Sequence, residues 1–133
     1  MTPQEILYSI KKECIDIHKE FGPGLLEKAY QRILKLKLEK RGFVVNEEVA
    51  CSINVDGEII ENAYYIDLLV NDCVIVELKA VQKLKPEHHK QLFTYMRLAN
   101  KDAGLLVNFC CDNLFRDGLR SWNKAQLNLF SIQ

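Results

Sequence analysis

The chain has 133 residues, of which 48% are hydrophobic and 27% charged, and its 18 basic and 18 acidic side chains leave no net charge. This length predicts one domain over residues 1–133, and the composition is typical of a globular protein rather than a disordered one. No apolar run approaches the roughly 20 residues that span a bilayer, and no signal peptide opens the chain, so a membrane partner is not expected. The five cysteines are odd in number and show no Cys-x-x-Cys spacing. They argue against disulfides and structural zinc, and predict a cytoplasmic protein.

Charge is unevenly distributed along the chain. Residues 44–78 hold eight acidic residues and no Lys or Arg, whereas residues 79–101 hold six Lys or Arg and one acid, Glu87. This pattern fits metal ligands beside a phosphate-binding edge that includes Lys83, Lys85 and Lys90. An ordinary solvated helix fits the basic segment as well.

Two helices are expected at the start. Thr2 is a typical N-cap, followed by Pro and by Glu5 three residues later. An apolar stripe at helical spacing comprises Ile6, Ile10, Cys14 and Ile17. The second helix is expected at about 25–41, closed by Gly42. Its expected core face comprises Leu26, Tyr30, Ile33 or Leu34, and Leu38.

Strands dominate the middle of the chain. Three runs rich in β-branched and aromatic residues, at 43–54, 58–70 and 74–80, are separated by short turns and predict an antiparallel meander. A third helix is expected from Pro86 to about residue 100, and a buried strand at 103–109, parallel to a neighbour because a helix precedes it. Residues 112–124 are expected to be irregular or helical, and 127–132 to form an edge strand. The order αα-βββ-α-β indicates an α/β domain with a central mixed sheet flanked by helices.

Three charged residues interrupt the apolar strands: Asp67 in the second, and Glu77 and Lys79 in the third. An unpaired charge on a half-buried strand is costly, so a divalent cation is the natural partner for the two carboxylates. A two-residue loop at Asn71-Asp72 would place Asp67 and Glu77 on opposite faces of the sheet. The metal hypothesis therefore requires a bulge or a three-residue connection over 71–73, which would set Asp67 directly opposite Glu77.

Two spacings resemble a known family. Asp67 followed by Glu77-Leu78-Lys79 across a turn resembles the signature of the PD-(D/E)XK nuclease superfamily. Gly24-Leu-Leu-Glu27-Lys-Ala-Tyr30 resembles the motif of the GxxExxY protein family within it, and Gln91-x-x-x-Tyr95 resembles a motif of its exonuclease-like branch. The resemblance implies a restriction-endonuclease-like core.

The resemblance also implies a function. The chain is expected to be a metal-dependent nuclease that hydrolyses phosphodiester bonds of nucleic acid, with DNA as the expected substrate. Mg²⁺ or Mn²⁺ would be held by Asp67, Glu77, the carbonyl of Leu78 and Glu27. Lys79 and Gln91 complete the expected catalytic set, and the expected substrate-positioning residues are Tyr30, Lys83, Lys85, Lys90 and Tyr95. Two alternatives stay open: a catalytically silent binding or regulatory module of this fold, and a structural protein that forms a homodimer through an edge strand.

Overall fold

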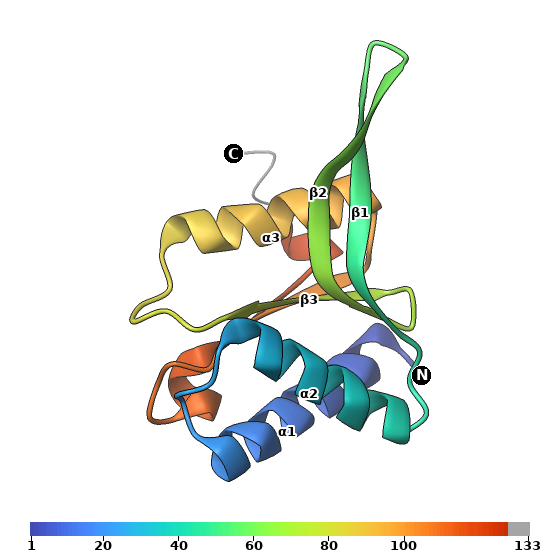
Figure 1. The fold of residues 1–133 in the computed structure, drawn as a ribbon. Helices are drawn as coiled ribbons and strands as arrows, with labels where there is room; N and C mark the ends of the chain where they lie inside the picture. The colour runs from blue at the N-terminus through green and yellow to red at the C-terminus, as the bar shows by residue number, and fades with distance from the viewer. Residues whose placement is uncertain (128–133) are drawn as a thin grey trace.

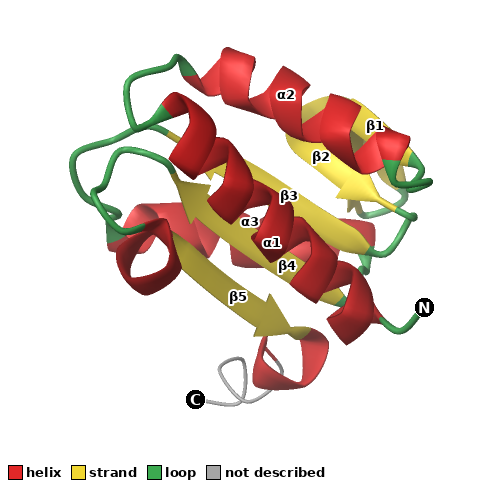
Figure 2. Cartoon of the chain, turned by 90° about the horizontal axis from the view of Figure 1, so that it is seen from below, coloured by secondary structure: helices red, strands yellow, loops and turns green. Residues whose placement is uncertain are grey.

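The computed structural model describes residues 1–127, which form a five-stranded sheet between two layers of helices (Figures 1 and 2). In chain order the elements are α1 (Pro3–Phe21), α2 (Glu27–Lys40), β1 (Val45–Val55), β2 (Glu58–Val70), β3 (Val74–Lys79), α3 (Pro86–Ala99), β4 (Ala103–Asn108), the π-helical turn η1 (Leu114–Gly118) and β5 (Leu119–Asn123). Helices α1 and α2 cover one face of the sheet and α3 covers the other. The expected restriction-endonuclease-like α/β core is confirmed.

The sheet has the strand order β1-β2-β3-β4-β5, with β4 parallel to β3 and the other neighbours antiparallel. The parallel pair follows from the crossover through α3, as the sequence predicted. The β1–β2 hairpin turns at Asp56 and Gly57, whose φ angles of 54° and 87° are those of a type I′ turn. The tip of this hairpin projects beyond α3 (Figure 1).

Helix α1 begins as expected, because the Thr2 hydroxyl accepts a 3.1 Å hydrogen bond from the amide of Glu5. Its apolar stripe is fully enclosed against the sheet. Helix α2 begins at Glu27 rather than Leu25, and the prediction that Leu26 lies in the core is wrong: Leu26 is 80% exposed. Its extended backbone (ψ 152°) precedes the first helical turn, so its side chain does not share the buried face of Leu34 and Leu38.

Helix α3 packs on the opposite face through Leu92, Tyr95 and Met96. Its close approach depends on Gly104 in β4, where an added Cβ would lie 2.7 Å from Met96 Sδ and 2.9 Å from a Leu92 methyl carbon. A larger residue there would force the Met96 and Leu92 side chains to move.

The C-terminal part differs from the sequence prediction. Residues 119–123, expected to be irregular or helical, form the edge strand β5, which pairs antiparallel with β4. Pairing with an already buried neighbour, rather than local pattern, determines this strand. The edge strand predicted at 127–132 lies outside the described residues except for Leu127. Within the described part of the chain, no helix combines the length and apolarity required to cross a membrane.

Candidate active site

The β2–β3 hairpin has the three-residue connection that the metal hypothesis requires. Val70 pairs with Val74, and the amide of Cys73 donates to the Val70 carbonyl at 3.0 Å. Asn71 and Asp72 both adopt positive φ angles, 49° and 55°, which Asn and Asp tolerate better than most residues. The last printed pair of this register is Leu68 with Val76, and Asp67 and Glu77 are the next residues on their strands.

Glu77 faces the α3 side of the sheet, because it lies two residues after Ile75, which belongs to the cluster beneath α3. The charges of both Glu77 and Asp67 act on Tyr95 of that helix. Beyond the last β2–β3 pair, backbone amides donate to the two carboxylates rather than to backbone carbonyls. The Asp67 amide donates to Glu77 Oε1 at 3.1 Å, and the Leu78 amide donates to Asp67 Oδ2 at 2.9 Å.

Burial makes this pair hard to ionise. Glu77 is only 3% exposed, and burial together with the neighbouring charge of Asp67 raises its pKa to about 9. Burial likewise raises the pKa of Asp67. Lys79, half-buried and two residues after Glu77, lowers the pKa of both carboxyls. Two coupled acids and one amine thus share the end of the β2–β3 pair.

Tyr95 faces this pair from α3. Burial and the charges of Glu77 and Asp67 raise the pKa of its phenol to about 12, and its ring contacts Tyr64 edge-on with centroids 5.6 Å apart. Gln91 lies one helical turn before Tyr95 on the same side of α3. Gln91 therefore lies on the side of α3 that carries Tyr95.

Glu27 reaches the site from the other helical layer. It is the first residue of α2, and its Oε1 accepts a 3.0 Å hydrogen bond from the amide of Ala80, directly after Lys79. Within residues 1–127, no three His, Cys, Asp or Glu side chains are grouped to hold a metal ion. The structure thus brings Asp67 and Glu77 together and places Glu27 at the end of β3.

Tyr30 is fully buried and stacks on Phe109 with ring centroids 4.0 Å apart. Its hydroxyl donates to the Gly22 carbonyl at 2.5 Å and accepts from the Leu25 amide at 3.1 Å. Tyr30 therefore fixes the loop that leads into Glu27.

A family model described as the PD-(D/E)XK nuclease superfamily matches residues 4–121. The chain belongs to the PD-(D/E)XK nuclease superfamily. The pattern Asp67 followed by Glu77-Leu78-Lys79 lies within the matched residues. Among solved structures, the crystal structure of SSO0001 is 21% identical, with a TM-score of 0.45, over 90% of this chain and 67% of that one. No curated protein matches the chain.

This nuclease-superfamily domain contains a clamp that sequence reasoning missed. Asn108 is buried at the end of β4; its Oδ1 accepts from the Val81 amide at 3.1 Å and its Nδ2 donates to the Val81 carbonyl at 2.9 Å. The amide of Phe109 donates to the Lys79 carbonyl at 3.0 Å. The sequence signal that could have identified this contact is a polar residue, Asn108, at the end of an otherwise apolar buried strand.

A second missed cluster joins α2 to β1 beside Asp67. Glu48, with a φ of 50°, forms an ion pair with Lys28 and accepts a 2.9 Å hydrogen bond from buried Gln31. The charge of Glu48 adds to the rise in the pKa of Asp67, so this acid belongs to the surroundings of the site. Of its two partners on α2, Lys28 lies within the Gly24–Tyr30 motif and Gln31 directly follows it.

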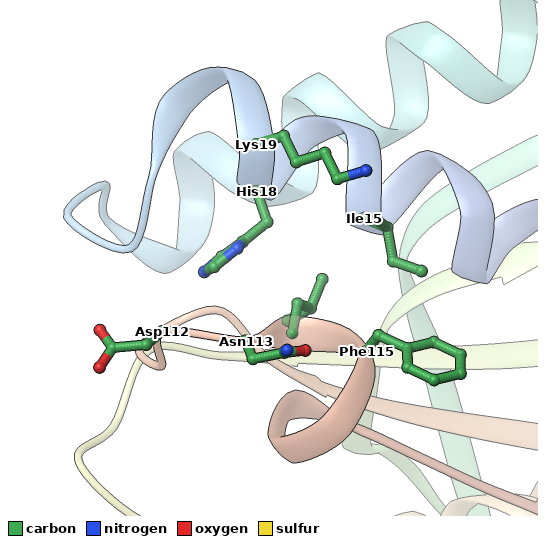
Figure 3. A pocket seen from close by; sticks show the side chains of 7 residues that line it. Ile15, His18, Lys19, Asp112, Asn113 and Phe115 are labelled. Atoms are coloured by element: carbon green, nitrogen blue, oxygen red, sulfur yellow. The ribbon is translucent and has the colours of Figure 1, made fainter.

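The three predicted phosphate-facing lysines, Lys83, Lys85 and Lys90, are exposed around the β3–α3 connection and the start of α3. A hollow of about 400 Å³ there is lined by Val81, Gln82, Lys83, Lys85, Glu87 and His88. His88 Nδ1 accepts from the Lys85 amide at 2.9 Å, so this ring caps α3. A separate hollow between α1 and residues 112–115 contains His18 and Phe115 and none of the predicted site residues (Figure 3).

Proposed function

We propose that this domain is a metal-dependent nuclease that hydrolyses phosphodiester bonds of DNA. The observation that carries the proposal is the contact between Asp67 and Glu77 just beyond the last β2–β3 pair, with the charge of Lys79 acting on both. Membership of a nuclease superfamily gives the reaction class.

The donor set suits a hard divalent cation. Two carboxyls lie close enough for each to alter the other's pKa, and both pKa values are raised because the pair is buried. A bound cation would offset the unfavourable energy of ionising two buried carboxyls side by side. Mg²⁺ and Mn²⁺ prefer carboxylate and carbonyl oxygen. We propose Asp67, Glu77 and the Leu78 carbonyl as its ligands. Because one oxygen of Glu77 and one of Asp67 already accept amides, each carboxyl keeps a second oxygen for the metal.

A bound cation would acidify a coordinated water and neutralise charge on the scissile phosphate. Lys79 orients that water or donates to the phosphate oxygens as charge develops. Glu27, one oxygen of which is used by the Ala80 amide, contributes through a water molecule. Its contact with Ala80 also holds the backbone next to Lys79.

The remaining residues position the substrate. Gln91 and Tyr95 present polar groups from α3, and Lys83, Lys85 and Lys90 contact phosphates without reading sequence. We infer further that the domain belongs to the GxxExxY group. Two residues of the GxxExxY motif support this inference. Tyr30 holds the loop before α2 through Gly22 and Leu25, and Glu27, at the start of that helix, contacts Ala80.

The test is cleavage of end-labelled DNA and RNA, single- and double-stranded, with Mg²⁺, Mn²⁺ or EDTA. Cleavage should require the metal and fall at least about 100-fold in Asp67→Asn, Glu77→Gln and Lys79→Met, since each loses a group that acts on the transition state. Asp56→Asn in the exposed β1–β2 turn and Lys40→Met at the end of α2 are matched controls. Equal cleavage by Asp67→Asn and wild type would overturn the proposal.

A further inference from the structure

A further hollow lies beside the one lined by residues 81–88, between α3 and β5. It has a volume of about 460 Å³ and is lined by Leu84, Lys85, Pro86, His89, Lys90, Phe93 and Trp122. This volume falls within the range of about 300–1,000 Å³ typical of small-ligand pockets. We propose that this hollow binds one unstacked nucleobase and so selects single-stranded nucleic acid; the inference rests on, and deepens, the proposed nuclease function.

Aromatic rings form the wall of the hollow. Phe93 stands edge-on to Trp122 with centroids 5.1 Å apart and an interplanar angle of 87°, and His89 stands edge-on to the same ring at 6.3 Å and 86°. All three side chains are half-buried, so each presents surface to the hollow. Rings fixed in crossed orientations offer both a face and an edge to a planar base, and base–aromatic stacking tolerates any sequence.

Positive charge surrounds this apolar wall. Lys85 and Lys90 are exposed on its rim, and the whole segment 79–101 carries six basic residues against the single acid Glu87. An aromatic wall with a basic rim matches a nucleobase attached to phosphates. The base stacks on the apolar rings, and the nucleic-acid backbone is attracted by the lysines. A purely apolar peptide would leave those cations without a complementary partner.

The hollow adjoins the one lined by residues 81–88, with which it shares Lys85. The lining of that neighbouring hollow begins at Val81, two residues after Lys79 along the chain. On α3, the Gln91–Tyr95 side and the His89–Phe93 side flank the buried stripe of Leu92 and Met96. In this proposal, a strand that crosses the start of α3 has a base against Trp122 and its phosphates on Lys85 and Lys90.

This arrangement distinguishes single strands from duplexes. In a duplex each base is stacked on both faces and paired, so it can stack on these rings only after extrusion, which costs a few kcal/mol. An unpaired base enters without that cost. The expected substrate is thus a single strand, a frayed end or an overhang.

Trp122 makes the proposal directly testable, because it is the chain's one tryptophan. Fluorescence of the full-length protein is titrated in EDTA, so that no cleavage occurs, with a short oligothymidylate, a duplex of equal length and inorganic phosphate. The single strand should quench Trp122 and bind at least about tenfold more tightly than the duplex, with affinity falling as salt rises. No quenching, equal binding of the duplex, or quenching by phosphate alone would overturn the base site.

Variants separate the two parts of the hollow. Phe93→Leu should weaken single-strand binding roughly tenfold, while its control, Phe115→Leu on an exposed ring at η1, should leave it unchanged. Lys90→Gln, an exposed position that does not threaten folding, should also weaken binding and reduce its salt dependence, whereas Lys40→Gln should not. Unchanged binding in both Phe93→Leu and Lys90→Gln would contradict the proposal.

Quenching that persists while no substrate is cleaved with Mg²⁺ or Mn²⁺ would refute the nuclease reaction and leave the base site standing.

Discussion

The amide of Asp67 donates to the side chain of Glu77 across the β2–β3 pair, at 3.1 Å. In return the Asp67 carboxylate accepts from the amide that follows Glu77, at 2.9 Å. Each acid thus replaces a backbone carbonyl of the ladder. The strand pair ends in a carboxylate pair, and the protonation of these two groups is coupled to the stability of the sheet.

Replacing Asp67 by Asn separates metal binding from stability. A cation that binds only the folded state stabilises it by about 2.7 kcal/mol at a concentration of 100 Kd, which is a rise of roughly 10 °C in the Tm of a domain this size. Asp67→Asn should abolish that rise, because one ligand and its charge are lost. In EDTA the variant should be as stable as wild type or more so, since one of two opposed buried acids is neutral. Thermal scans with MgCl₂, MnCl₂ and CaCl₂ measure this; Asp56→Asn, in the exposed turn, should keep the full rise.

Removal of the Glu77 charge should change how stability depends on pH. Glu77 has a pKa of about 9 in the folded protein against 4.5 for an ordinary Glu. Its favourable contribution is complete below about pH 4.5 and is lost as pH rises toward 9, because the unfolded chain releases this proton first. In EDTA, Glu77→Gln should therefore gain stability relative to wild type between about pH 5 and pH 8.5.

Urea unfolding at the two pH values measures this difference. Asp67 acts in the same direction, because its pKa is also raised. Glu87→Gln, at an exposed position on α3, serves as the control and should show no such trend. A difference between Glu77→Gln and wild type that stays constant with pH would show that the Glu77 carboxyl ionises normally.

Two substitutions of Glu27 distinguish its two tasks. Glu27→Gln keeps an oxygen for the Ala80 amide, whereas Glu27→Ala removes the acceptor. If Glu27 assists the cation through water, Glu27→Gln should weaken Mg²⁺ binding several-fold in calorimetry while its Tm in EDTA stays near that of wild type. Glu27→Ala should weaken binding and also lower stability by about 1 kcal/mol. If Glu27→Gln binds Mg²⁺ as tightly as wild type, Glu27 does not assist the cation, and its role is limited to the contact with the Ala80 amide.

Tyr30→Phe tests the loop before α2. The ring would still stack on Phe109, but the Gly22 carbonyl and the Leu25 amide would lose their partner. We expect a loss of about 1–2 kcal/mol in the free energy of unfolding, measured by chemical denaturation. Tyr8→Phe, at a side chain that is 70% exposed, should change it by less than about 0.5 kcal/mol. Equal effects would show that the Tyr30 hydroxyl does not hold the loop.

Much of the architecture was predictable because local patterns were strong. The cap at Thr2, the apolar stripe of α1 and the Asp56-Gly57 turn depend on residues within one helical turn or one hairpin, and each formed as expected. Leu26 and β5 were not predictable in this way. Whether Leu26 lies inside depends on where α2 starts, and β5 exists because β4 offers an edge for pairing.

The sequence by itself determined the types of group at the candidate site: an acid on one strand, Glu-x-Lys on the next, and a Gln–Tyr pair one helical turn apart on α3. It left open whether Asp67 and Glu77 share a face, because a two-residue and a three-residue connection were both compatible with Asn71-Asp72. The tertiary structure selected the three-residue connection, in which Val70 pairs with Val74, and brought the two acids into contact through hydrogen bonds to backbone amides. It alone revealed that Asn108, Gln31 and Glu48 surround the site. These contacts join residues 17 to 27 positions apart, and such contacts depend on how the layers pack rather than on any local period of the chain.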